Sequence, residues 1–326
     1  MFKNKTIIIT GGTGSFGNAA LQFLKKKPFK EIRIFSRDEM KQWNMSQDYN
    51  DKKFKFIIGD VRDLSSLNNA FEDVDYVIHA AATKIVPTAE YNPKECILTN
   101  IQGAMNVIDA AKKNNVKKVI ALSTDKASNP INLYGASKLC SDKLFIAANF
   151  LSKKKIRTTF SIVRYGNVMG SRGSVIPFFL KQKRKGIFTL TDKNMTRFMI
   201  SLDKAVAMVL DSFKEALGGE IFVSKIPSMR VIDIAKTIGE KNKIKIIGIR
   251  PGEKLHEQMI GVEDSNFTFE YKNYYKILPA IYDLYKNKKY IKNGKKVSYN
   301  FSYSSDNNQQ WMKKTEFKKW LSKNLI

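Results

Sequence analysis

The stretch TIIITGGTGSFG at residues 6–17 constrains the fold of this 326-residue chain more than any other. A β-branched run, Thr6–Thr10, leads into glycines, and an amphipathic pattern, Ser15–Lys26, follows. Glycines at these spacings allow a tight turn between a strand and a closely packed helix, whose free N–H groups suit a pyrophosphate. The pattern predicts a dinucleotide site made by Gly11, Gly12, Thr13, Gly14, Ser15, Phe16 and Gly17.

Strand and helix patterns alternate through the first half of the chain. Strands are expected at Glu31–Ser36, Phe54–Asp60, Tyr76–Ala81, Lys118–Thr124 and Thr159–Tyr165, and helices at Pro93–Asn114 and Leu133–Asn149. This alternation predicts an α/β fold with a Rossmann-type doubly wound parallel sheet. Later strands at Glu220–Lys225 and Ile244–Ile249 suggest a smaller, interleaved C-terminal domain. We predict no structure for the Tyr- and Lys-rich tail after Glu270.

The end of the second strand bears on the choice of dinucleotide. NAD sites usually place Asp or Glu there to bind the ribose 2′-hydroxyl. This chain has Ser36 and Arg37, followed by Asp38 and Lys41. Because a hydroxyl and cations suit a 2′-phosphate, we predict NADP as the cofactor.

Residues after the third and fourth strands complete the predicted cofactor site. Asp60, next to Val61, can accept a hydrogen bond from the exocyclic amine of an adenine. Ala80 and Ala81 are small enough to let the backbone approach the cofactor. We interpret His79 as a core histidine and not as a catalyst.

The segment STDKASNPINLYGASK at residues 123–138 concentrates reactive side chains. Thr124, Asp125 and Lys126 follow a strand at the edge of the sheet where ligands bind in open α/β folds. Tyr134 and Lys138 are four apart on the next helix and share a face. A nearby ammonium and a positive nicotinamide would lower the pKa of Tyr134, so the phenol could take a proton from a substrate hydroxyl.

The net charge and the cysteine content limit the kinds of partner that the protein can bind and the cellular compartment that it suits. The net charge of +27 comes mostly from scattered Lys, which we interpret as a solvated surface. If the charge instead attracts an anionic partner, a phosphorylated substrate would account for it as well as a nucleic acid. Cys96 and Cys140 form no C-x-x-C pattern, so we expect a cytoplasmic protein without a metal site. No apolar run approaches the ~20 residues that span a bilayer, and we expect no membrane or nucleic-acid partner.

Several long motifs resemble those of one family within the extended short-chain dehydrogenase/reductase superfamily. They are FSRDE (35–39), GDVRD (59–63), HAAATK (79–84), STDKASNPINLYGASK (123–138), RYGNVMGSRGSV (164–175), MTRF (195–198) and RPGEKLHE (250–257). Together they resemble the inverting UDP-N-acetylglucosamine 4,6-dehydratases over about residues 5–305. Related hexose dehydratases carry an acidic residue after the Asp, so Lys126 points to the inverting subgroup.

The resemblance implies a reaction without net redox change. Tyr134 would deprotonate the C4 hydroxyl of UDP-N-acetylglucosamine as hydride passes to NADP⁺. Lys126 would abstract the C5 proton, if its neighbours keep part of it neutral, and Asp125 would protonate the departing C6 hydroxyl. Return of hydride to C6 and reprotonation of C5 from the opposite face would give UDP-2-acetamido-2,6-dideoxy-β-L-arabino-hex-4-ulose, in the first step of pseudaminic acid biosynthesis.

The resemblance also implies substrate contacts and an organisation in two units. Substrate-binding residues would be Lys84, Thr99, Asn167, Val175, Thr191, Arg250 and Glu253, with Arg250 on the diphosphate and Glu253 on the nucleoside ribose. Residues 1–166 and about 203–225 would form the NADP-binding Rossmann domain. Residues 167–202 and about 226–326 would form the UDP-sugar-binding region. A homo-oligomer, either a dimer or a hexamer, is expected.

Four alternatives stay open at this point. A relative group with Met at the tyrosine position is disfavoured by Tyr134. Retaining 4,6-dehydratases share the cofactor site, but often carry an N-terminal membrane region. A UDP-sugar 4-epimerase would need Tyr134 and Lys138 but has no use for Asp125 and Lys126. A non-catalytic NADP-sensing module predicts a broken catalytic set, whereas all four residues are present.

Overall fold

The computed structural model describes residues 1–151 and 158–325 and contains a large mixed sheet. Its strands are β1 (Thr6–Thr10), β2 (Glu31–Ser36), β3 (Phe54–Ile58), β4 (Tyr76–His79), β5 (Lys118–Thr124), β6 (Thr159–Tyr165), β10 (Ile221–Ser224), β14 (Thr268–Glu270), β15 (Tyr274–Ile277) and β16 (Lys295–Lys296). In the described residues the sheet has ten strands in the order β16-β14-β15-β10-β6-β5-β4-β1-β2-β3. The strands from β3 to β10 run parallel, and β15, β14 and β16 add antiparallel. The predicted α/β class and Rossmann-type sheet are confirmed.

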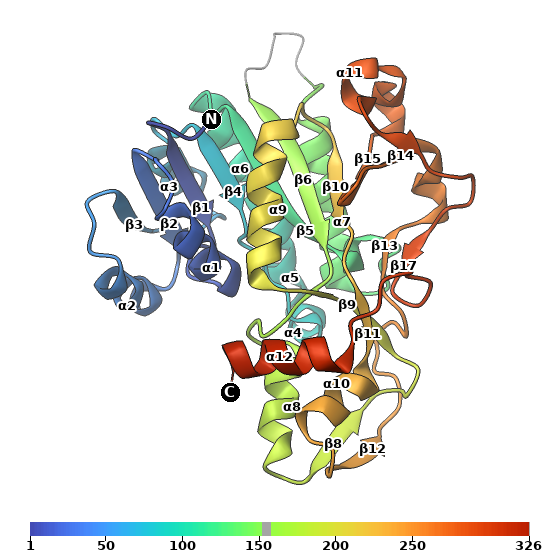
Figure 1. The fold of residues 1–326 in the computed structure, drawn as a ribbon. Coiled ribbons are helices and arrows are strands. Elements are labelled where there is room, and N and C mark those ends of the chain that lie inside the picture. The colour runs from blue at the N-terminus through green and yellow to red at the C-terminus, as the bar shows by residue number, and fades with distance from the viewer. Residues whose placement is uncertain (152–157, 326) are drawn as a thin grey trace.

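Helices cover both faces of this sheet (Figure 1). They are α1 (Ser15–Leu24), α2 (Glu39–Asp48), α3 (Leu64–Ala70), α4 (Val86–Tyr91), α5 (Pro93–Ile97), α6 (Gly103–Lys113), α7 (Leu133–Ala147) and α9 (Leu202–Glu215). α1 contacts α9 on one face, while α6 contacts both α3 and α7 on the other. The central strands between them are largely apolar and buried, and β1 is buried along its whole length, because a sheet covered on both faces has no solvent-facing side.

A π-helical turn, Leu98–Gln102, interrupts the helix predicted at Pro93–Asn114. The side chain of Asn100 explains the interruption. Its amide donates to Thr83 O and Ser137 Oγ, both at 2.9 Å, and its Oδ1 accepts from Thr83 N at 2.8 Å. The extra residue in the turn directs this amide into the fold, and helix periodicity alone does not predict it.

A second core lies below the large sheet in Figure 1. Its elements are α8 (Val175–Lys183), α10 (Val231–Ile238), α12 (Lys314–Asn324), β7 (Asn167–Val168), β8 (Ile187–Leu190), β9 (Thr196–Ile200), β11 (Ser228–Arg230) and β12 (Lys243–Ile246). Phe179, Phe188 and Phe317 are fully buried there. The strand expected at Ile244–Ile249 corresponds to β12, which pairs with β8 and not with the large sheet. Which ligand each unit binds stays a prediction.

The tail after Glu270 is ordered into named elements, although its sequence predicted none. β15 pairs with β10, β13 (Gln258–Ile260) pairs with β17 (Tyr303–Ser304), and α11 (Lys288–Ile291) and α12 follow. Together with β14 just before it, the tail strands β15 and β16 extend the sheet beyond β10 and cover a side that would otherwise be an open edge.

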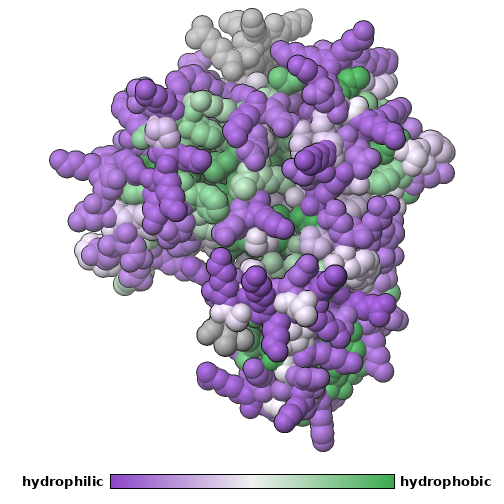
Figure 2. All heavy atoms as spheres, in the orientation of Figure 1, coloured by the Kyte–Doolittle hydropathy of each residue, from purple (hydrophilic) through white to green (hydrophobic). Residues whose placement is uncertain are grey.

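The outer surface is predominantly hydrophilic on the face that Figure 2 displays. Its exposed stretches include Lys25–Lys27, in accordance with the interpretation of the charge as a solvated Lys-rich surface. Among the described residues, none of the helices has the length and apolar character needed to cross a membrane.

Candidate active site

The carboxyl ends of the parallel strands open onto a cleft of about 790 Å³ between the two units. Of the residues that the sequence predicted as a site, all but Gly12 and Gly17 line this cleft. Both exceptions allow close packing behind the turn. A Cβ on Gly17 would lie 2.0 Å from Gly12 O, and one on Gly12 would lie 2.8 Å from Ile34 Cγ2.

The turn between β1 and α1 fits a dinucleotide phosphate. Gly11 has a φ of +67°, and a Cβ there would lie 2.7 Å from Ala81 Cα, so only glycine suits the position. α1 begins at Ser15 after Gly14, and no side chain caps its first N–H groups. These groups are therefore available for an anion in the cleft, as the glycine pattern predicts.

Hydrogen bonds and ion pairs already link the predicted adenosine-binding residues to one another. Thr13 Oγ1 donates to Ser36 Oγ at 3.1 Å. Asp38 caps α2 and forms an ion pair with Lys41. The side chain of Arg37 is more than half exposed, and its Nη1 lies 3.8 Å from Asp60 Oδ2. Arg37 is thus the most accessible cation in this part of the cleft.

His79 is confirmed as a core histidine. Its Nδ1 lies 2.8 Å from Thr10 Oγ1, and burial lowers its pKa to about 3, so the ring is neutral at physiological pH. The backbone beyond it, at Ala80 and Ala81, reaches the cleft as expected from the small side chains.

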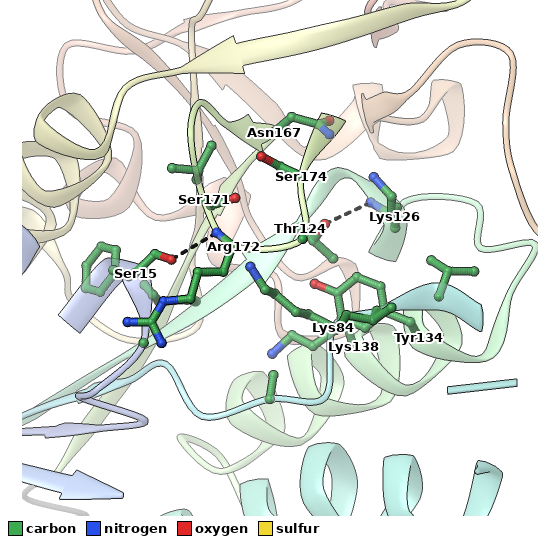
Figure 3. Close-up of a pocket in the computed structure, with 18 of the residues that line it drawn as sticks. Ser15, Lys84, Thr124, Lys126, Tyr134, Lys138, Asn167, Ser171, Arg172 and Ser174 are labelled. Carbon is green, nitrogen blue, oxygen red and sulfur yellow. Dashed lines mark hydrogen bonds between the residues drawn. The ribbon is translucent and has the colours of Figure 1, made fainter. Parts of the chain in front are cut away.

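The catalytic segment is built by a turn and a capped helix. Asp125–Ala127 form a single 3₁₀ turn directly after β5, and the Thr124 hydroxyl accepts from Lys126 N at 3.3 Å. Asn132 caps α7 by accepting from Gly135 N at 2.8 Å. Tyr134 and Lys138 then project from the first turns of α7 into the cleft, with the Tyr134 hydroxyl pointing towards Thr124 (Figure 3).

Asp125 and Lys126 are held in a buried charge cluster with two further residues. Lys126 Nζ lies 3.1 Å from Asp125 Oδ1 and 2.9 Å from Glu257 Oε1. Arg197 Nε lies 3.6 Å from the same oxygen of Glu257. Sequence analysis missed Glu257 and Arg197, although both lie in quoted motifs. Glu257 is the last residue of RPGEKLHE, and Arg197 is the third residue of MTRF.

Burial and neighbouring charges shift the pKa values of Lys126, Asp125 and the nearby Tyr134. Burial alone would lower the pKa of Lys126, but Asp125 and Glu257 outweigh burial and raise it, so Lys126 is an ammonium. Burial raises the pKa of Tyr134 to about 12 in the field of the protein alone. The predicted lowering depends on a cationic nicotinamide beside the ring and stays a prediction. Burial also raises the pKa of Asp125, and Glu257 reinforces this effect while Lys126 opposes it.

The predicted substrate residues surround the other half of the cleft. Thr191 Oγ1 donates to Glu253 Oε2 at 3.1 Å, and Arg250 Nη1 lies 3.8 Å from Glu253 Oε1. The remaining predicted substrate residues, Lys84, Thr99, Asn167 and Val175, also line the cleft.

Arg172 is a further cation that sequence analysis missed, although it lies in the quoted motif RYGNVMGSRGSV. Its backbone N–H donates to Ser15 Oγ at 3.2 Å, so the loop after β7 reaches the first turn of α1 (Figure 3). Burial lowers the pKa of Lys84, and the charge of Arg172 lowers it further. The two cations favour an anionic ligand between the units.

The variant Lys126→Ala tests the charge balance of this cluster. Without the ammonium, the buried carboxyls of Asp125 and Glu257 would hold a proton more tightly than in the unfolded chain, where the carboxyl pKa is near 4. Below about pH 4 we expect the variant to have the same free energy of unfolding as wild type. As the pH rises from about 5 to about 8, the free energy of unfolding of the variant should fall below that of wild type. The loss should reach about 3–5 kcal/mol, measured by urea unfolding at several pH values.

The matched control is Lys193→Ala, which removes an exposed ammonium. Its free energy of unfolding should follow the wild-type pH dependence within about 0.5 kcal/mol. Parallel pH curves for Lys126→Ala and wild type would contradict the charge balance described here.

Known proteins resemble this chain over nearly its whole length. The family model described as "Polysaccharide biosynthesis protein" matches residues 7–279. A UDP-N-acetylglucosamine 4,6-dehydratase (inverting) of Campylobacter jejuni subsp. jejuni serotype O:23/36 (strain 81-176) is 55% identical over 97% of each chain. A UDP-glucose 4-epimerase of Rickettsia bellii (strain OSU 85-389) is 48% identical over 95% of this chain and 93% of its own.

Solved structures show the same fold. The X-ray structure of Pen from Bacillus thuringiensis has a TM-score of 0.90 and 37% identity, and covers 100% of this chain and 99% of its own. The dTDP-glucose 4,6-dehydratase DesIV from Streptomyces venezuelae, solved with NAD bound, has a TM-score of 0.69 and 20% identity over 77% of this chain and 86% of its own. The chain therefore belongs to the polysaccharide biosynthesis protein family and, within the extended short-chain dehydrogenase/reductase superfamily, to the group of inverting UDP-N-acetylglucosamine 4,6-dehydratases.

Proposed function

We propose that the protein is an NADP-dependent UDP-N-acetylglucosamine 4,6-dehydratase that inverts C5 and gives UDP-2-acetamido-2,6-dideoxy-β-L-arabino-hex-4-ulose. The observation that carries the proposal is the Asp125–Lys126 pair, held in the same cleft as Tyr134 and Lys138. Oxidation at C4 alone needs only a tyrosine and a lysine. An added acid and base serve a reaction that also removes a proton from C5 and a hydroxyl from C6.

Each catalytic residue has a defined task in this proposal. NADP⁺, when bound, supplies hydride transfer at C4 and later at C6. Tyr134 takes the C4 hydroxyl proton, and Lys138 favours the phenolate and holds the ribose next to the nicotinamide. The resulting 4-ketone acidifies the C5 proton, which Lys126 takes. Asp125 gives its proton to the departing C6 hydroxyl, so that water leaves.

The raised pKa values set two conditions on this mechanism. Tyr134, with a pKa of about 12 in the field of the protein alone, needs further positive charge beside it to ionise near neutral pH. A cationic nicotinamide would supply that charge. Lys126 must lose a proton before it can act as a base, because its two carboxylate partners hold it as an ammonium.

The UDP moiety would lie along the second unit. Arg250 suits the diphosphate, since a guanidinium can bind two oxygens at once, and Glu253 can accept from the hydroxyls of the nucleoside ribose. Lys84, Thr99, Asn167, Val175 and Thr191 would complete the sugar pocket. Arg172 would add a cation beside Lys84. These assignments, the place in pseudaminic acid biosynthesis, cytoplasmic localisation and a homo-oligomer, either a dimer or a hexamer, are parts of the proposal.

A UDP-sugar 4-epimerase is the second candidate, because relatives of that name are 48% identical to this chain. Such an enzyme would oxidise and reduce the same C4 atom, and its product would have the mass of the substrate. The proposed dehydratase would release one water for each product. Mass spectrometry of the product distinguishes the two candidates directly.

Tyr134→Phe tests the first step of the proposed reaction. Loss of the phenolic proton acceptor should reduce 4-keto product formation about 10²–10⁴-fold, while the folded protein keeps its bound cofactor. The control Tyr91→Phe changes an exposed ring and should leave the rate unchanged. Near-wild-type product formation by Tyr134→Phe would refute its role as the base, and loss of the cofactor would indicate a structural role instead.

The dinucleotide extracted from the purified protein tests the cofactor assignment. We expect NADP, since Arg37 is available for a 2′-phosphate. Arg37→Ala should weaken NADP binding about 10–100-fold relative to NAD, as expected for loss of a charge-assisted contact. Arg184→Ala, which removes an exposed guanidinium at the end of α8, should not change the preference. Recovery of NAD from the wild-type protein would contradict the assignment.

A further inference from the structure

Glu257 is a buried carboxylate that the reaction described above does not use. Only 2% of its side chain is exposed, and it lies just before β13, whose Met259 and Ile260 pack in the core of the large sheet. Its Oε1 is 2.9 Å from Lys126 Nζ, which belongs to the turn after β5. The contact therefore joins the predicted C5 base to an element far away in the sequence.

The backbone around Glu257 is fixed by several hydrogen bonds. Its N–H donates to Ser305 Oγ at 2.9 Å, and its carbonyl accepts from Ser305 N at 2.7 Å. Ser305 Oγ lies 2.6 Å from Thr196 Oγ1 on β9. The backbone that carries the carboxylate is thus anchored to Ser305 and, through it, to β9, which limits the positions that the carboxylate and its partner Lys126 can take.

A simple structural ion pair does not account for this arrangement. One carboxylate, that of Asp125, already lies within reach of Lys126, and burying a second carboxylate carries a large desolvation penalty. Arg197 compensates the charge of Glu257, and Lys254, which donates to Ser128 O, faces the same cluster. Asp125 Oδ2 and Glu257 Oε2 nevertheless have no hydrogen-bond partner among the residues that the structure describes.

The chemistry of elimination gives the second carboxylate a purpose. The ion pair of Lys126 with Asp125 corresponds to an ammonium and a carboxylate, which are the wrong states for a base and an acid. Transfer of one proton from Lys126 Nζ to Asp125 Oδ1, across 3.1 Å, produces a neutral amine and a carboxylic acid together. The amine then takes the C5 proton, and the acid gives its proton to the C6 oxygen as the C6–O bond breaks and water leaves. Both residues return to their starting states.

We propose that Glu257 is a positioning residue that holds Lys126 Nζ against Asp125 Oδ1, so that this proton transfer prepares the base and the acid in one step. The inference rests on the proposed dehydratase function. Glu257 would accept an N–H of the amine throughout the cycle and keep the nitrogen lone pair directed towards C5 or Asp125. It touches neither the substrate nor the cofactor in this account.

The inference separates two steps of the reaction. C4 oxidation depends on Tyr134 and Lys138 and precedes the work of Lys126. Removing the carboxylate of Glu257 should therefore slow elimination but leave the first hydride transfer nearly intact. Reduced cofactor would then accumulate on the enzyme, with its near-ultraviolet absorbance as the signal.

The test mixes Glu257→Gln with UDP-N-acetylglucosamine and follows reduced cofactor and 6-deoxy-4-keto product in parallel. We expect product formation to fall about 100-fold, as for loss of acid–base catalysis, while cofactor reduction stays within about threefold of wild type. Glu257→Asp keeps the charge but shortens the reach, and should show a smaller loss with the same accumulation. Glu263→Gln, an exposed neighbour in the sequence, should behave as wild type.

Product formation by Glu257→Gln within about threefold of wild type would overturn the inference. A parallel loss of both steps, without accumulation of reduced cofactor, would also overturn it, since that is the result of a general structural role. If Glu257→Gln does not fold, Glu257→Asp decides by the same two measurements. Failure of the wild-type protein to make a dehydrated product would instead refute the proposed function.

Discussion

The structure of the site depends on one buried ammonium, that of Lys126, placed between the carboxylates of Asp125 and Glu257. Asp125 and Lys126 follow β5, while Glu257 precedes β13, which pairs with β17. The ion pairs join segments that are far apart in the sequence inside the cleft where a substrate is proposed to react. It also determines which residues carry protons, because each charge in this low-dielectric environment depends on its neighbours.

The sheet explains why such a cluster can exist at this place. Parallel strands direct their carboxyl ends to one edge, so the turns after β1, β4 and β5 meet there. The glycine turn, the alanines after His79 and the catalytic segment come from these three turns. The second unit closes the same edge with Arg172, Arg250 and Glu253, and the cleft between the units is lined by cations where phosphates are proposed to bind.

Local patterns in the sequence predicted the parallel half of the fold well. β1, β2, β5 and β6 have the predicted bounds, because each is a mostly buried run rich in apolar and β-branched residues. The tail was not predicted, since β15 forms by antiparallel pairing of Tyr274–Ile277 with a strand far back in the sequence. Short half-exposed strands of this kind depend on their partners more than on their own composition.

The candidate site shows the same division between local and long-range information. Thr124, Asp125, Lys126, Tyr134 and Lys138 lie in one segment, so their joint presence in the cleft follows from one strand and one helix. The pairing of Lys126 with Glu257 connects residues 131 positions apart, and no local pattern indicates it. For the same reason the sequence did not reveal that two carboxylates hold Lys126 as an ammonium, or that burial raises the pKa of Tyr134 in the field of the protein alone. Both depend on burial and on partners that only the folded chain brings together.

The central claim is that Asp125 and Lys126 carry out acid–base chemistry at C5 and C6. It is tested most directly by NMR of the product formed from UDP-N-acetylglucosamine by the purified protein in D₂O, without added cofactor. The account predicts a 6-deoxy-4-keto sugar of L-arabino configuration with deuterium at C5. A product of D-xylo configuration would contradict inversion at C5, and a 4-epimer that retains its C6 hydroxyl would contradict the role of the Asp125–Lys126 pair.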